Sequence, residues 1–182
     1  FVFRLDADAG RFQPANPPFV VAEPGAGPRH VAFHPEKRCA YVVNELNSTI
    51  TALGYEEGGN GMAPLQTLSS APDNVGVKNT GSEILVHPSG RFVYVSNRGH
   101  DSVGVFEIDQ ADGTLRPTAW FPTGGKTPRA IALDPSGRFL YAANQTSDTI
   151  VAFRVDAGTG ALTPTGQSVS TGSPSTMAFF TP

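Results

Sequence analysis

The chain contains one internal repeat, which occurs three times within its 182 residues. The copies begin at Gly27 with GPRHVAFHPEKRCAYVVNELNSTITAL, at Thr80 with TGSEILVHPSGRFVYVSNRGHDSVGVF and at Thr127 with TPRAIALDPSGRFLYAANQTSDTIVAF. Successive copies start 53 and then 47 residues apart. This spacing excludes the shorter helical repeats, and it is typical of β-propeller blades, which have about 40 to 50 residues in four strands.

Each copy of the repeat predicts four β-strands. It opens with a short apolar strand, and the second and third copies then turn at Pro-Ser-Gly-Arg, where Pro favours φ of about −65° and Gly tolerates strained backbone. An asparagine corner precedes the third strand, and a glycine-containing turn leads to the fourth at Leu65, Leu115 and Leu162. The 20 Gly and 16 Pro residues lie among runs of Val, Ile, Phe, Tyr and Thr, which favours strands over helices. The chain is therefore predicted to be an all-β propeller.

The two ends of the chain predict a ring that is incomplete. Residues 1–6 match the third strands of the second and third copies, so the chain starts in mid-blade. An open stack of blades leaves sheet edges and a hydrophobic face uncovered, so we expect the rest of the ring to come from residues before Phe1 or from a second chain. The predicted parts are the last two strands of a blade in 1–26, blades at 27–79, 80–126 and 127–172, and a ring-closing first strand at 173–182.

Composition and charge argue against several classes of function. A net charge of −3 supplies no basic surface for nucleic acid, and no stretch reaches the ~20 apolar residues of a membrane-spanning helix. The single cysteine, Cys39, excludes an internal disulfide, and its alignment with Phe92 and Phe139 predicts a buried small hydrophobic residue. Because the four histidines lack tight ligand spacing, the site is predicted to need no metal and no other cofactor. We expect a cytoplasmic protein.

Positions that differ between the copies are the candidates for function. A residue present in every copy maintains the structure of the blade, whereas a residue present in one copy can belong to a site that the protein has only once. The first strand starts at Arg29-His30, Ser82-Glu83 or Arg129-Ala130, and the residue after the corner asparagine is Glu45, Arg98 or Gln145. The innermost strands of a propeller line its central channel. We therefore expect five of these side chains to converge near the axis: Arg29, His30, Glu45, Glu83 and Arg98.

Each of these five candidates also has a structural interpretation. Arg29 and Arg98 would form ion pairs between blades or bond carbonyl groups. Glu45 would pair with a neighbouring arginine, and His30 would pack at the start of its strand. Glu83 would balance the charge of the arginines. The sequence alone leaves both interpretations open.

The remaining polar candidates lie in turns and loops. His34 and His87 occupy a turn where the third copy has Asp134, which predicts that they cap the turn. His100, in a Gly-His-Asp corner, is a candidate substrate contact, with a surface loop residue as the alternative. Lys126 ends a Thr-Gly-Gly-Lys run that would suit a phosphate, although the run lacks the spacing of a phosphate-binding P-loop and a plain linker is the alternative.

Several motifs of the chain, taken together, resemble one known family. They are GPRH followed by AFHP, VNEL with NST, SNRGHDS, TGGKTPR, DPSGRFL and the closing GQSVS. This combination is similar to the lactonase family of seven-bladed β-propellers, which includes bacterial 6-phosphogluconolactonases and the fungal 3-carboxy-cis,cis-muconate lactonizing enzyme. The resemblance covers essentially the whole chain and corresponds to the C-terminal half of a family member. It implies about three and a half four-stranded blades of a seven-bladed ring.

The resemblance also implies an activity and the residues that perform it. The family's active-site residues fall on Arg29, Glu45 and Arg98, and its catalytic histidine falls in the half that this chain lacks. The implied function of the complete ring is hydrolysis of a sugar lactone such as 6-phosphogluconolactone, with muconate cyclisation as the alternative. The fragment alone is then expected to be inactive. A propeller that only binds a ligand is a further alternative, because fold does not determine function.

The chemistry of the candidate side chains agrees with a small anionic lactone or carboxylate as substrate. Two guanidinium groups can hold a carboxylate or phosphate and stabilise charge on a carbonyl oxygen. For lactone hydrolysis, Glu45 or His30 is the predicted base that activates water, with Arg29 or Arg98 facing the oxyanion. In muconate cyclisation the arginines would instead anchor the carboxylates of the substrate.

Overall fold

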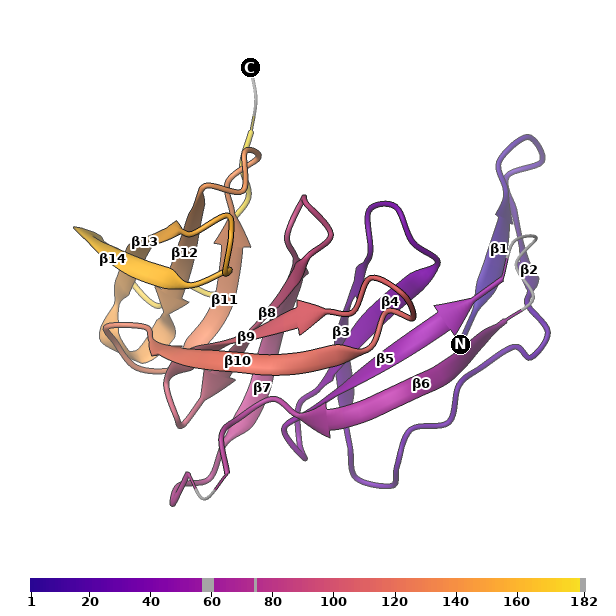
Figure 1. Ribbon diagram of the computed structural model, residues 1–182, viewed down its shortest axis with the longest axis horizontal. Helices are drawn as coiled ribbons and strands as arrows, with labels where there is room; N and C mark the ends of the chain where they lie inside the picture. Colours follow the sequence, from indigo (N-terminus) through magenta and orange to yellow (C-terminus); the bar gives the residue numbers. More distant parts are fainter. Residues whose placement is uncertain (57–60, 74, 181–182) are drawn as a thin grey trace.

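The computed structural model describes residues 1–56, 61–73 and 75–180, and within them the regular secondary structure is almost entirely β-strand (Figure 1). A single turn of 3-10 helix, Gln145–Ser147, is the exception among these residues. The strands are β1 (Phe3–Asp6), β2 (Arg11–Pro14), β3 (Pro28–Phe33), β4 (Cys39–Asn44), β5 (Thr49–Tyr55), β6 (Met62–Ser69), β7 (Thr80–Val86), β8 (Phe92–Arg98), β9 (Ser102–Ile108), β10 (Leu115–Pro122), β11 (Pro128–Leu133), β12 (Phe139–Asn144), β13 (Thr149–Val155) and β14 (Leu162–Ser170).

The strands form three four-stranded antiparallel sheets and one hairpin. Each sheet keeps the order of the sequence, as β3-β4-β5-β6, β7-β8-β9-β10 and β11-β12-β13-β14, and β1 pairs with β2. The first strand β7 contacts the first strands β3 and β11 of its two neighbours, and the sheets lie side by side in Figure 1. The prediction of an all-β propeller with four strands per blade is confirmed: the chain is about three and a half blades.

Hydrophobic side chains pack between neighbouring blades rather than inside a single one. One core lies between the first and second blades and a second core lies between the second and third. Tyr41 and Tyr94 are fully buried in these cores. Their hydroxyl groups donate hydrogen bonds to the next blade, Tyr41 to the carbonyl of Gly113 at 2.9 Å and Tyr94 to that of Gly160 at 3.0 Å. The ring of the repeated tyrosine thus packs in the core, while its buried hydroxyl group forms a hydrogen bond to the next blade.

The buried histidines cap turns, as predicted, and also join blades. His34 Nδ1 accepts the backbone N–H groups of Glu36 and Lys37, so the ring proton is on Nε2, which donates to the carbonyl of Gly90 at 2.8 Å. His87 repeats this arrangement with Gly137 at 3.0 Å. The bond to the next blade was not predicted, because its acceptor is a backbone carbonyl about fifty residues away.

Cys39 is buried beside Tyr41, and its Sγ lies 3.3 Å from the tyrosine hydroxyl. The interpretation of Cys39 as a buried small hydrophobic residue is therefore confirmed.

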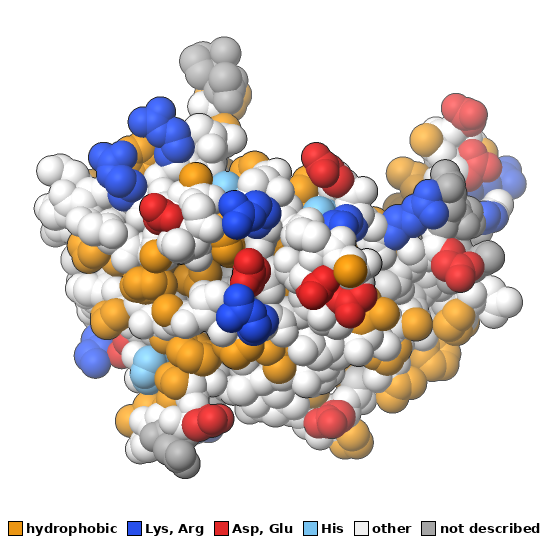
Figure 2. Space-filling model, viewed as in Figure 1, with side chains coloured by type: hydrophobic (Ala, Val, Ile, Leu, Met, Phe, Trp, Pro, Cys, Tyr) orange, Lys and Arg blue, Asp and Glu red, His pale blue; other side chains and the backbone are white. Residues whose placement is uncertain are grey.

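The N-terminal hairpin and the first blade carry hydrophobic side chains that are exposed. The β1–β2 hairpin exposes Phe3 and Phe12, and the first blade exposes Phe33. Acidic and basic side chains are interspersed with hydrophobic ones on the face shown in Figure 2. Such exposed apolar faces are what an open stack of blades is expected to show.

The predicted ring-closing strand at 173–182 is not formed in this structure. Residues 171–180 carry no strand, and residues 181–182 lie outside the described residues. The segment instead packs against the last blade, where the rings of Phe179 and Tyr141 have centroids 5.4 Å apart. The physical reason is that a first strand pairs with the second strand of its own blade, and among the described residues no such strand follows this segment. Ring closure by this segment stays a prediction.

Candidate active site

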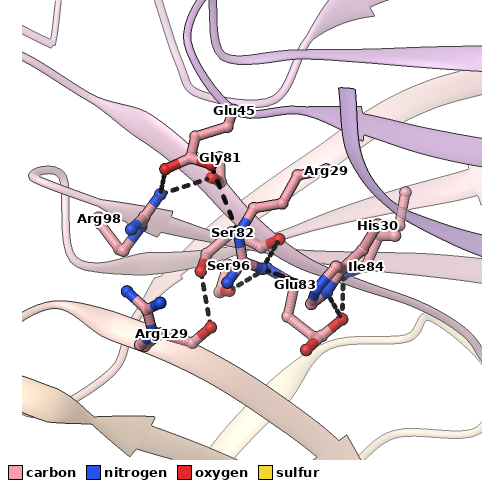
Figure 3. Close-up of polar contacts among 10 residues, drawn as sticks. All are labelled: Arg29, His30, Glu45, Gly81, Ser82, Glu83, Ile84, Ser96, Arg98 and Arg129. Carbon is pink, nitrogen blue, oxygen red and sulfur yellow. Dashed lines mark hydrogen bonds and ion pairs between the residues drawn. The ribbon is translucent and has the colours of Figure 1, made fainter. Parts of the chain in front are cut away.

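The candidate side chains come from two kinds of position in the blade. Arg29, His30 and Glu83 lie on the first strands β3 and β7, whereas Glu45 directly follows β4 and Arg98 ends β8. Each first strand is antiparallel to the second, with Pro28 opposite Asn44 and Thr80 opposite Arg98. The start of one strand therefore meets the end of the other, and all five side chains gather at one end of the inner strands (Figure 3).

Glu45 holds two arginines from neighbouring blades. Its Oε1 is 2.5 Å from Nη2 of Arg98, and its Oε2 is 3.6 Å from Nε of Arg29. Arg98 also donates to the carbonyl of Gly81 at 3.1 Å. The side chains of Arg29 and Arg98 are only 17% and 14% exposed, so their charges lie largely away from solvent.

Interactions within this group shift the pKa values of Glu45 and Arg29. The hydrogen bond from Arg98 is the main cause that lowers the pKa of Glu45, with burial opposing it. Burial and the nearby charge of Arg98 lower the pKa of Arg29. Glu45 is therefore ionised at neutral pH, and it is a poor proton acceptor because two cations stabilise its charged form.

His30 and Glu83 form a second pair beside the arginines. Nδ1 of His30 is 2.5 Å from Oε1 of Glu83, and the imidazole is 42% exposed. When Nδ1–H donates to this carboxylate, Nε2 is the nitrogen that is left to accept a proton. Nη1 of Arg29 lies beside the imidazole, 3.1 Å from Nδ1 and 3.2 Å from Nε2, and it donates to the carbonyl of Ser82 at 2.8 Å. A carboxylate, an imidazole and a guanidinium thus lie next to one another.

Arg129 and Ser82 belong to the same group, although neither was selected from the sequence. The Ser82 hydroxyl donates to the carbonyl of Arg129 at 2.6 Å. The charge of Arg129 is close enough to lower the pKa of both Arg29 and Glu45. The repeat contained a signal for Arg129, because it occupies the same position in the third copy as Arg29 does in the first.

His100 and Lys126 are not brought to this group. Nδ1 of His100 lies 2.8 Å from the hydroxyl of Ser102, so the imidazole contacts a residue of its own corner. Nζ of Lys126 pairs with Asp101 at 3.1 Å and is 72% exposed. The predicted substrate contacts of these two residues are therefore not supported by their positions, because nearer hydrogen-bond and charge partners hold both side chains.

A concave surface begins at Glu83 and continues along the inner strands. It has a volume of about 510 Å³, and it follows β7 and β11 as far as Phe179. Apolar side chains line most of it, including Leu85 and Ile131. A small molecule bound here would reach the polar group at one end.

No three His, Cys, Asp or Glu side chains within residues 1–56, 61–73 and 75–180 gather in a way that would hold a metal ion. Within the same ranges, no helix is long and apolar enough to cross a membrane.

Comparison with known proteins relates nearly the whole chain to one family. The family model described as "Lactonase, 7-bladed beta-propeller" matches residues 1–179. The 6-phosphogluconolactonase of Bacillus subtilis (strain 168) is 46% identical over 106 residues, which cover 58% of this chain and 30% of that protein.

Solved structures give the same result for the fold. The periplasmic gluconolactonase of Pseudomonas aeruginosa superimposes with a TM-score of 0.87 and 38% identity, covering 97% of this chain and 49% of that one. A protein from Lactobacillus plantarum gives a TM-score of 0.85 with 30% identity, over 94% and 49% of the two chains. This chain thus spans about half the length of these relatives.

Proposed function

Because the chain belongs to the lactonase family of seven-bladed β-propellers, we propose that the ring containing it hydrolyses a sugar lactone such as 6-phosphogluconolactone. The proposal concerns the complete ring, since the chain covers 49% of the solved gluconolactonase. The partner that completes the ring is, in this proposal, the N-terminal half of the same propeller. The observation that carries the proposal is the placement of the His30–Glu83 pair beside Arg29 at the end of the inner strands.

In the proposed reaction His30 is the general base. Its Nε2 accepts a proton from water while the water oxygen attacks the lactone carbonyl carbon. Glu83 holds the ring through Nδ1 and stabilises the imidazolium that forms, as a carboxylate does in hydrolytic triads. Nη1 of Arg29 lies beside both ring nitrogens of His30 in the structure, so in this proposal the guanidinium shifts toward the carbonyl oxygen when substrate binds and leaves Nε2 open to the water.

The arginines stabilise the negative charge that the attack creates. The carbonyl oxygen becomes an oxyanion, and Arg29 supplies cationic N–H donors beside the base. The tetrahedral intermediate then breaks its ring carbon–oxygen bond, and the His30 imidazolium returns the proton to the leaving alkoxide. The product is the open-chain hydroxy acid, so atoms and charge balance without a cofactor.

Glu45, the alternative base, fits a different role. Its carboxylate is engaged by Arg98 and Arg29, and these contacts favour its ionised form. We assign it the positioning of the two guanidinium groups. The 6-phosphogluconolactonase and gluconolactonase relatives favour hydrolysis over muconate cyclisation and over a binding platform. A cytoplasmic location stays a prediction.

The test is hydrolysis of 6-phosphogluconolactone by the complete ring, followed as proton release at constant pH. We expect His30→Asn to lower kcat about 100-fold or more, since general bases contribute roughly 10²- to 10⁴-fold. Arg116→Gln is the matched control, because Arg116 pairs with Glu107 on the outer strands and is 73% exposed. A complete ring that does not exceed the spontaneous rate would overturn the proposed function.

A further inference from the structure

Arg129 is a member of the polar group that the proposed reaction does not use. It lies near the start of β11, on the third inner strand, and its side chain is half-buried. Among the residues that the structure describes, its guanidinium has neither an ion pair nor a hydrogen bond. A half-buried cation without a partner is costly, and such groups are usually paired or bind a ligand.

The group as a whole carries surplus positive charge. Arg29, Arg98 and Arg129 contribute three positive charges, and Glu45 and Glu83 contribute two negative ones, so with a neutral imidazole the net charge is +1. Glu45 is shared by Arg29 and Arg98, and Glu83 is engaged by His30. Neither carboxylate is left for Arg129. An anion is therefore the ligand that would complete this charge arrangement.

Hydrogen bonds fix the position of Arg129 relative to the proposed reaction centre. Arg29 donates to the carbonyl of Ser82 at 2.8 Å, and the Ser82 hydroxyl donates to the carbonyl of Arg129 at 2.6 Å. Three neighbouring inner strands are thereby held in register. In Figure 3 the side chains of Arg129 and His30 lie on opposite sides of Ser82, and Arg98 lies on the side of Arg129. The group therefore has a reacting end at His30, and another end where the unpaired Arg129 lies near the Arg98–Glu45 pair.

We propose that Arg129, together with Arg98, binds an anionic group of the substrate that lies away from the lactone carbonyl, and so selects a phosphorylated lactone over the neutral one. The planar fork of donors in arginine matches phosphate oxygens bidentately. This inference rests on the proposed function, because it takes the His30 end as the place of the carbonyl. It assigns Arg129 to substrate specificity and not to the chemical step.

The test compares two substrates in the complete ring, 6-phosphogluconolactone and glucono-lactone. We expect Arg129→Gln to raise KM for the phosphorylated lactone about tenfold or more, because a hydrogen bond between charged groups is lost. KM for the neutral lactone and kcat for both should stay within about twofold. A purely structural role of Arg129 would instead change both substrates alike, and that result would overturn the inference.

Binding provides a readout that does not depend on turnover. Calorimetry with the product 6-phosphogluconate should show affinity lost in Arg129→Gln, whereas gluconate should bind wild type and variant equally weakly. Arg116→Gln, which removes an arginine from the outer strand β10, should leave both titrations unchanged. Equal binding of 6-phosphogluconate by wild type and Arg129→Gln would overturn the inference.

The two proposals fail in distinguishable ways. If the complete ring hydrolyses neither lactone, the proposed function is wrong, and the calorimetric titration still decides whether Arg129 binds the phosphate. If it hydrolyses both lactones with the same KM, and Arg129→Gln alters neither, the function stands and the specificity role of Arg129 is wrong.

Discussion

At the scale of single residues, Glu45 shows how one carboxylate can organise a site. Arg29 and Arg98 come from different blades, and their like charges would repel each other at close range. Glu45 lies between them, accepts a hydrogen bond from Arg98 and forms an ion pair with Arg29 at 3.6 Å, which offsets their repulsion. Its contribution is therefore to geometry, and a change at Glu45 should act through the arginines.

The first prediction concerns this geometry. We expect Glu45→Gln to lower kcat/KM of the complete ring about tenfold or more, because small displacements of catalytic groups are costly. Glu107→Gln is the matched control, since Glu107 pairs with Arg116 at an exposed place outside the site. Steady-state kinetics of both variants provide the measurement, and an equal effect of the two changes would contradict the role given to Glu45.

The second prediction concerns acid stability. The pKa of Glu45 is lowered in the folded protein from 4.5, its usual value. The folded state therefore gains stability from the ionised carboxylate above the unfolded pKa, and it loses this contribution as the pH falls through the folded pKa. Urea denaturation of wild type and Glu45→Gln should show wild type more stable near neutral pH, with the difference shrinking below about pH 4. A difference that grows on acidification would contradict this linkage.

At the scale of elements, the turns between first and second strands lock each blade to the next. Gly90 has φ +67°, and a Cβ there would lie 2.5 Å from the ring of His34. Gly137 repeats this arrangement, with a Cβ that would lie 2.6 Å from His87. Glycine is needed at both turns because the backbone is left-handed and because the histidine of the preceding blade occupies the space of a side chain.

The third prediction follows from this packing. Gly90→Ala should lower the free energy of unfolding by about 2 to 4 kcal/mol, since it adds a clash to the roughly 1 kcal/mol of backbone strain. Gly10→Ala is the matched control, because Gly10 has φ +61° and no atom within 4 Å of the added Cβ. Chemical denaturation measures both changes. Equal losses would mean that backbone strain alone matters and that the contact with His34 does not.

Asp101 joins two other elements of the fold. It has φ 55° at the corner before β9, and its Oδ1 accepts the backbone N–H of Thr127 at 2.8 Å. Its Oδ2 pairs with the exposed Lys126. Thr127 is itself left-handed at φ 58°, directly before β11. The side chain of Asp101 thus fixes the path of the chain into the strand that carries Arg129.

The fourth prediction separates the two contacts of Asp101. Asp101→Asn keeps a hydrogen-bond acceptor and tolerates the left-handed backbone, so we expect a loss below about 1 kcal/mol, as for an exposed ion pair. Asp101→Ala should lose about 1 to 3 kcal/mol, because the Thr127 N–H loses its acceptor and the backbone is strained. Thermal or urea unfolding gives both values. If Asn is as damaging as Ala, the ion pair with Lys126 is the important contact.

At the scale of the whole molecule, the open stack leaves apolar surface at its ends. Phe12 is 72% exposed, Phe33 is 55% exposed and Phe180 is 88% exposed. In a closed ring the faces of the end blades would be covered by neighbouring blades, which removes both exposed apolar area and unpaired strand edges. The stability of this chain should therefore depend on the rest of the ring.

The fifth prediction is that a protein extended to the full seven blades binds less of a hydrophobic dye per mole than the 182-residue chain. It should also unfold at a higher denaturant concentration, because apolar burial stabilises it by about 25 cal/mol per Å². Dye fluorescence and urea titration of the two proteins provide the comparison. Equal dye binding would show that the end faces of this chain are already covered.

The propeller could be predicted from the sequence because a blade is built from local hairpins. Each strand pairs with its neighbour in the chain, so the repeat, its turns and its alternating apolar residues are sufficient. Comparing the copies also identified Arg29, His30, Glu45, Glu83 and Arg98, which the structure brings together. The same comparison passed over Arg129, although it occupies in the third copy the position that Arg29 has in the first.

Only the tertiary structure decided which charges meet. The contacts of the site join residues about fifty positions apart on neighbouring blades, such as Arg98 with Glu45 and His30 with Glu83. The tertiary structure likewise paired Lys126 with Asp101, left Arg129 without a partner among the described residues, and packed the last segment against β12. The sequence of each repeat determines the pairing of neighbouring strands, whereas the contacts between side chains of different blades depend on how the blades stack. The sequence by itself therefore determined the architecture and most members of the site, and the stacking determined their partners.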